Sequence, residues 1–219
     1  MDGDEIISSI SSIYESLLIS SGLRQHMVRV AAVGELICEN WSSGIRISRT
    51  DIIATLLIHD LGNVVKFNFD ELKFWYGQPK DEIDFWKEVK MDTIKKYGTS
   101  SDHEVTLQMA RGLGVNARIM SLLEKMGFNN IDAVAASNDF DLKICLYADQ
   151  RVGPSGIMSM SERFDDLRAR YGFGDGWSDD KGRAIELQIF NNTCIKPEDI
   201  NEDSARSAIA RYSKRMKIR

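Results

Sequence analysis

A histidine and an aspartate stand side by side, His59-Asp60, at the end of the apolar run formed by residues 52–58. Buried polar groups without a partner cost roughly a few kcal/mol each, so an imidazole and a carboxylate at this place need something that satisfies both. A divalent cation is the usual partner of such a pair. The pair therefore predicts a metal site at the end of a buried helix.

Few other residues could complete the coordination shell, because the chain has only three histidines. His26 lies in the first turns of an amphipathic helical pattern, and Asp149 is an acid on a largely apolar helical segment. Two imidazoles and two carboxylates suit manganese, cobalt, nickel, zinc or iron rather than calcium. We therefore expect His26, His59, Asp60 and Asp149 to bind such an ion.

In this order along the chain, the four residues resemble the pattern of the HD-domain superfamily of metal-dependent phosphohydrolases. The resemblance covers roughly residues 22–171. The residues that flank each position support it: Arg29 after the first histidine, Leu61-Gly62 after the pair, and Val152-Gly153 and Glu162-Arg163-Phe164 after the last aspartate. It implies a phosphohydrolase in which a metal-activated water attacks a small phosphomonoester or a nucleotide.

Two departures from the wider family bear on the number of metal ions. Many members carry a lysine after the pair and its glycine, whereas this chain has Asn63, with Lys66 close to one helical turn later. Members with two metals carry further histidines before the last aspartate, whereas this chain has only His103 there and no imidazole in residues 135–138. We therefore expect one ion, and this disfavours the cyclic-dinucleotide phosphodiesterase and di-iron oxygenase branches.

The predicted chemistry assigns roles to a few more side chains. A bound ion can polarise a phosphoryl oxygen and lower the pKa of its water towards roughly 7, so Asp60 is expected to be catalytic as well as a ligand. Arg29, one helical turn from His26, and Lys66 are expected to bind the phosphate, and Lys66 to assist catalysis. For both, a solvated or salt-bridged surface role is an equally weighted alternative. Arg151 points away from Asp149 and ranks below them.

His103 is the one histidine outside the predicted ligand set. It could be the acid that protonates the leaving group, a second-metal ligand, or a plain first-turn residue of the helix that Ser101 caps. We favour a catalytic role for His103, and we interpret Glu104 as the capping-box partner of Ser101.

Aromatic side chains gather in residues 74–76 and 85–86. They could stack a nucleobase over the site, or they could form the core between two helices. We favour core, because clustered aromatic side chains usually pack on one another and bury large areas.

Composition narrows the class of protein. The chain has 219 residues, 43% apolar content and a formal net charge of −5, which disfavours an extended nucleic-acid partner or an anionic membrane surface. Its three cysteines are widely spaced without a CxxC motif, the N-terminus is acidic, and no apolar run reaches the roughly 18 residues of a spanning helix. We expect a cytoplasmic protein with a small phosphorylated substrate and no membrane partner, and with a homodimer as a candidate assembly.

The elements that must position these residues are helices. Apolar residues recur at helical spacing, prolines are few, and no strand pattern stands out. Thr50 and Asp51 are suitable caps for the helix that leads to His59, Gly62 is placed to end it, and Ser101 and Ser159 match the capping-box pattern. We predict an all-α, HD-domain-like bundle in a single domain, residues 1–219. Its core spans about 22–171, followed by an appended helical extension, 172–219. Further helices are expected at about 81–96, 116–126, 140–152, 179–190 and 201–216.

Two other classes of function stay open beside the enzyme. A non-catalytic HD module could keep the metal or the pocket to sense a nucleotide, and the asparagine in place of the family's lysine favours that reading. A purely structural or partner-binding bundle is the third, which the intact set of ligands disfavours.

Overall fold

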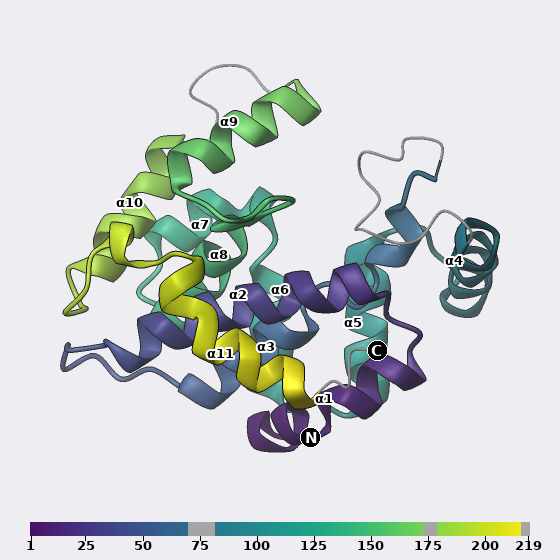
Figure 1. Ribbon diagram of the computed structural model, residues 1–219. Coiled ribbons are helices and arrows are strands. Elements are labelled where there is room, and N and C mark those ends of the chain that lie inside the picture. Colours follow the sequence, from purple (N-terminus) through teal and green to yellow (C-terminus); the bar gives the residue numbers. More distant parts are fainter. Residues whose placement is uncertain (70–81, 173–178, 216–219) are drawn as a thin grey trace.

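The computed structural model describes residues 1–69, 82–172 and 179–215, and within these ranges the chain is helical apart from loops and one short hairpin (Figure 1). The α-helices are α1 (Gly3–Ser16), α2 (Ser21–Glu39), α3 (Arg49–Ile58), α4 (Ile83–Tyr97), α5 (Asp102–Leu113), α6 (Ala117–Lys125), α7 (Ile131–Ala136), α8 (Phe140–Gln150), α9 (Met160–Tyr171), α10 (Asp179–Phe190) and α11 (Glu202–Arg215). The 3-10 helices are η1 (Asn63–Lys66), η4 (Phe128–Asn130) and η5 (Pro197–Asp199). The prediction of an all-α fold is confirmed.

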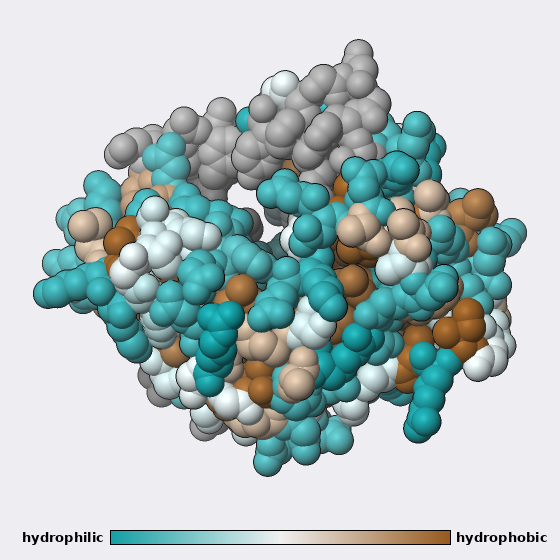
Figure 2. Space-filling model, turned by 180° about the vertical axis from the view of Figure 1, so that it is seen from behind, coloured by the Kyte–Doolittle hydropathy of each residue, from teal (hydrophilic) through white to brown (hydrophobic). Residues whose placement is uncertain are grey.

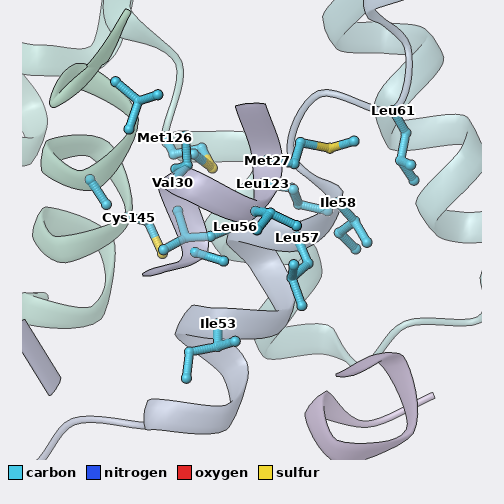
Figure 3. Packing of buried hydrophobic residues seen from close by; sticks show 14 of the residues in the cluster. Met27, Val30, Ile53, Leu56, Leu57, Ile58, Leu61, Leu123, Met126 and Cys145 are labelled. Atoms are coloured by element: carbon cyan, nitrogen blue, oxygen red, sulfur yellow. The ribbon is translucent and has the colours of Figure 1, made fainter. Parts of the chain in front are cut away.

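Helix α3 lies at the centre of the core. Every residue from Ile52 to Ile58 is buried, and a helix that is buried all round must be covered on every side. Helices α1, α2, α6 and α8 supply this cover. Figure 3 shows Leu56 and Leu57 of α3 among side chains of the neighbouring helices, such as Met27, Leu123 and Cys145. The end of α3, where His59 follows, is therefore held from several directions.

Two predicted helix starts are confirmed. The Ser101 hydroxyl accepts a hydrogen bond from the backbone N–H of Glu104 at the start of α5. At the start of α9, Ser159 and Glu162 form the complete reciprocal capping box. Each cap satisfies backbone donors that the first helical turn leaves without a partner.

The prediction for the start of α3 was wrong. The helix begins at Arg49, so Thr50 and Asp51 lie inside its first turn rather than at the cap position. The carboxylate of Asp51 instead accepts hydrogen bonds from the Ser48 hydroxyl and from the side-chain amide of Asn116 on the neighbouring helix. Ser48 holds the cap position, and the Asp51 carboxylate links it to the start of α6.

A small hairpin was missed by the sequence analysis. Strand β1 (Val152–Gly153) pairs antiparallel with β2 (Gly156–Ile157), and α8 ends at Gln150 instead of reaching residue 152. Strands of two residues are too short to show alternating polarity. Gly156 adopts φ +116°, a backbone conformation that favours glycine.

The C-terminal helices belong to the same core as the rest. Helix α10 packs against α7, α8 and α9, and α11 packs against α2. Their contribution to the buried cluster is Ile185, Ile189, Ala205, Ala208 and Tyr212. The predicted extension is thus built into the bundle, and α11 crosses over α2 in Figure 1.

Within the part of the chain that the structure describes, the most exposed large hydrophobic residues are scattered. These are Leu18, Ile45, Phe85, Met91 and Leu187, which lie on several different elements. The face in Figure 2 is mostly hydrophilic, with small separate apolar areas. Among the described helices, none combines the length and apolar character needed to cross a membrane.

Only part of the predicted aromatic cluster can be placed, because residues 74–76 lie outside the described ranges. Trp86 is buried on α4, in line with the core interpretation, and its indole N–H donates to the Glu82 carboxylate. Phe85 meets the Trp86 ring edge-on while half of its surface stays exposed.

Candidate metal centre

The four predicted ligands come from three separate parts of the chain and meet at one place. His26 lies on α2, His59 directly follows α3, Asp60 comes next in the turn, and Asp149 lies in the last turn of α8. The Nε2 atoms of His26 and His59 lie 3.5 and 3.6 Å from Asp60 Oδ2. The same two atoms lie 3.5 and 3.2 Å from Asp149 Oδ1. Each imidazole therefore faces both carboxylates.

The backbone at the end of α3 selects the reactive nitrogen of His59. Its Nδ1 lies 2.8 Å from the carbonyl oxygen of Leu56. A carbonyl can only accept, so Nδ1 carries the hydrogen and the neutral ring presents an unprotonated Nε2 to the two carboxylates. Orientation of this kind by a backbone carbonyl is common for histidines that bind metals.

Gly62 shapes the turn that carries Asp60, but in a different way from the one expected. Its φ is −83°, so it is not the left-handed glycine that often ends a helix. A Cβ at this position would lie 2.3 Å from the carbonyl oxygen of Asp102 and 2.7 Å from the backbone nitrogen of Thr106, while the Gly62 N–H donates to the Thr106 hydroxyl. Glycine is required because the turn rests directly on α5.

The charged groups of the cluster act strongly on one another. Burial disfavours a charged His59, but the carboxylates of Asp60 and Asp149 outweigh it and raise the pKa of His59 to about 9. Burial likewise opposes ionisation of Asp149, yet His59 and His26 hold the pKa of its carboxyl well below the ordinary value. The His59 side chain is 4% exposed and that of Asp149 is 33% exposed, so the cluster opens to solvent on the side of Asp149.

Three of the four predicted ligands, His26, His59 and Asp149, lie close enough together that they could hold a metal ion. Ligands about 2.1 Å from a tetrahedral ion lie about 3.4 Å from one another, and the four imidazole-to-carboxylate distances range from 3.2 to 3.6 Å. Donor atoms of His26, His59 and Asp149 all lie within 4.8 Å of one another. Asp60 contacts both imidazoles but is not part of that mutually close group. Two carboxylates also match the charge of a divalent cation.

Arg29, predicted to bind phosphate, is held by an acid from the far end of the chain. Its Nε donates to Glu202 Oε1 at 3.1 Å, and its side chain is partly exposed. Glu202 had no role in the sequence analysis, and no local pattern could have revealed it, because it stands 173 positions away.

Lys66 and His103 lie on either side of the contact between η1 and α5. The Lys66 ammonium donates to Asp102 Oδ2 at 2.8 Å. Burial opposes ionisation of Asp102, but Lys66 outweighs it and lowers the pKa of the Asp102 carboxyl. His103 follows Asp102 in the first turn of α5, and its side chain is exposed. The structure thus brings neither Lys66 nor His103 into the group of close metal donors.

Arg151 lies in a buried network of hydrogen bonds. It is buried, and its guanidinium donates to the carbonyls of Met158, Pro197 and Ile200 and to the hydroxyl of Tyr147. These bonds join the end of α8 to the hairpin and to the segment before α11. Arg151 therefore supports the backbone next to Asp149 rather than facing a substrate.

A separate surface depression of about 440 Å³ lies at the start of α3, where its lining includes Arg46, Arg49 and Asp141 and none of the four predicted ligands.

Comparisons with protein-family models, with curated proteins and with solved structures give no match to this chain.

Proposed function

We propose that this chain is a metal-dependent phosphohydrolase of the HD type that acts on a small phosphomonoester or a nucleotide. The observation that carries the proposal is the convergence of His26, His59, Asp60 and Asp149 with imidazole-to-carboxylate distances of 3.2 to 3.6 Å. The three free cysteines agree with a reducing, cytoplasmic location, which is part of the same proposal.

These four residues would hold one ion of manganese, cobalt, nickel, zinc or iron. When bound, such an ion supplies Lewis acidity towards a phosphoryl oxygen and lowers the pKa of a bound water towards roughly 7. The Asp149 carboxylate lies at the exposed side of the cluster, where a substrate can approach. His59, fixed by its bond to Leu56, keeps Nε2 aimed at the same point.

The two carboxylates offset the charge of a divalent ion, so other cations must attract the phosphate. Arg29 is the stronger candidate, because Glu202 engages only its Nε and the terminal amino groups can bind two oxygens of one phosphoryl group. Lys66 sits beside the turn of the metal cluster, where Asp102 holds its ammonium. His103 is assigned the transfer of a proton to the leaving oxygen, and its exposure leaves it accessible to substrate.

Hydrolysis of a panel of phosphomonoesters and nucleotides tests this function. The protein is stripped of metal and reloaded in separate samples with each of the five ions, and released phosphate is measured. We expect turnover that depends on metal and that disappears in Asp60→Ala. Asp132→Asn, an exposed substitution on α7, serves as the control and should keep the parent rate. Failure of all five metal forms to release phosphate from any member of the panel would refute the proposal.

One observation favours the sensing alternative. Arg29 and Lys66 are both already engaged in ion pairs, so a ligand would have to share them with Glu202 and Asp102. A sensor predicts that a nucleotide raises the unfolding temperature of the metal-loaded protein without being hydrolysed. The thermal shift and the phosphate assay, run on the same samples, separate the two functions.

A further inference from the structure

A single carboxylate oxygen joins three elements: α2, the hairpin and the start of α11. Glu202 Oε1, at the start of α11, accepts from Arg29 Nε on α2 at 3.1 Å and from the backbone N–H of Ile157 on β2 at 3.0 Å. Helix α2 also packs against both strands of the hairpin. The contact therefore links Arg29 to the hairpin that follows the Asp149 helix.

The hairpin lies directly against this carboxylate. Gly156 has φ +116°, and a Cβ added there would lie 2.5 Å from Glu202 Oε1. The positive φ favours glycine at this position, and the carboxylate end of the Glu202 side chain lies against it. The position of the Glu202 carboxylate is thus defined by backbone as well as by its charged partner.

The contact leaves the end of the Arg29 guanidinium accessible. Arg29 Nε donates to the Glu202 carboxylate, and within the described residues no hydrogen bond or ion pair engages the two terminal amino groups of the guanidinium. A guanidinium can meet one oxyanion along its Nε side and a second along its terminal fork. Arg29 also stands one helical turn from His26 on the same helix face.

We propose that Glu202 is a positioning residue for Arg29. Its carboxylate fixes the guanidinium so that the terminal fork faces the phosphoryl group of the substrate, and helix α11 thereby completes the anion-binding side of the site. This inference rests on the proposed phosphate-ester chemistry of the same site. It also gives the C-terminal helix a part in substrate binding.

The test measures binding of inorganic phosphate to the manganese-loaded full chain by calorimetry. Glu202→Gln keeps the shape of the side chain but removes its charge, and we expect phosphate affinity to fall about tenfold, the size typical of one charge-assisted hydrogen bond. Metal content should stay at the parent level. Asp203→Asn, the neighbouring exposed acid in the same first turn, is the matched control for the charge lost at the helix start and should bind phosphate like the parent.

A second background separates positioning from a general structural effect. In Arg29→Ala, the further change Glu202→Gln should cause no additional loss of phosphate affinity, because the group to be positioned is gone. Equal losses in both backgrounds would overturn the proposal, and so would parent-like affinity of Glu202→Gln. If Glu202→Gln does not fold, Glu202→Asp takes its place: it keeps the charge but is one methylene too short to reach Arg29 and Ile157 together, so phosphate affinity should again fall in the parent background and stay unchanged in Arg29→Ala.

The phosphate-binding experiment and the hydrolysis experiment can refute the two proposals separately. A parent protein that binds phosphate but hydrolyses nothing in the panel would refute the proposed enzyme, while the positioning role would still be decided by the affinities of the variants. A parent protein that binds no phosphate would overturn the positioning role directly.

Discussion

Removal of metal ions should leave a protein whose stability falls as the pH rises from neutral to alkaline. In the metal-free cluster, burial lowers and the carboxylates of Asp60 and Asp149 raise the pKa of His59, with a net value of about 9 compared with an ordinary 6.5. A histidine whose pKa is higher in the folded state contributes stability that is fully present below about pH 6.5 and is lost as the pH rises through about 9. At about 1.4 kcal/mol per pKa unit, this contribution is about 3 kcal/mol.

Urea unfolding of the chelated protein from about pH 6 to about pH 9.5 measures this contribution. His59→Gln should lack it, so the difference in unfolding free energy between parent and variant should shrink by about 3 kcal/mol across that range. His103→Gln, an exposed substitution, should follow the parent. In metal-loaded protein the trend should reverse, because protons compete with the ion for the imidazoles. A constant difference between chelated parent and His59→Gln would refute the electrostatic account of the cluster.

Three substitutions test other parts of the site. Asp60→Ala should keep the helical circular dichroism signal while metal affinity falls at least about tenfold and hydrolysis falls with it; a full complement of metal with the parent rate would contradict the role. Gly62→Ala places a Cβ 2.3 Å from the Asp102 carbonyl and should destabilise the fold by at least about 1–3 kcal/mol, measured by thermal unfolding. Gly44→Ala, with open space around it, is the control, and an equal effect of the two would reject the explanation. His103→Ala should lower the hydrolysis rate and leave one bound ion per chain by elemental analysis, whereas loss of one of two ions would indicate a dinuclear centre.

The residues of the cluster could be found from the sequence because each stands in a local pattern. His59-Asp60 ends an apolar run, and His26 and Asp149 lie on segments with helical periodicity. Helical periodicity and helix ends depend on residues that are neighbours in the chain, so both can be recognised in the amino-acid sequence. The all-α fold and the starts of α5 and α9 were predictable for the same reason.

The surroundings of these residues were not predictable, because they depend on contacts between distant parts of the chain. Arg29 meets Glu202, and Arg151 binds the carbonyl of Pro197 46 positions away. Gly62 was expected to end a helix by its conformational freedom, yet it is required by the approach of α5. Single-sequence patterns report which face of a helix is buried but not which residues cover it.

The central position of α3 also bears on how the chain folds during synthesis. Residues 52–58 are buried on all sides and need α8 as part of their cover, but α8 begins about 80 residues later. At a synthesis rate of roughly 5–20 residues per second, this segment waits about 4–16 s for that partner. Nascent chains that end before α8 should therefore expose α3, making this interval the one in which chaperone binding or aggregation competes with productive folding.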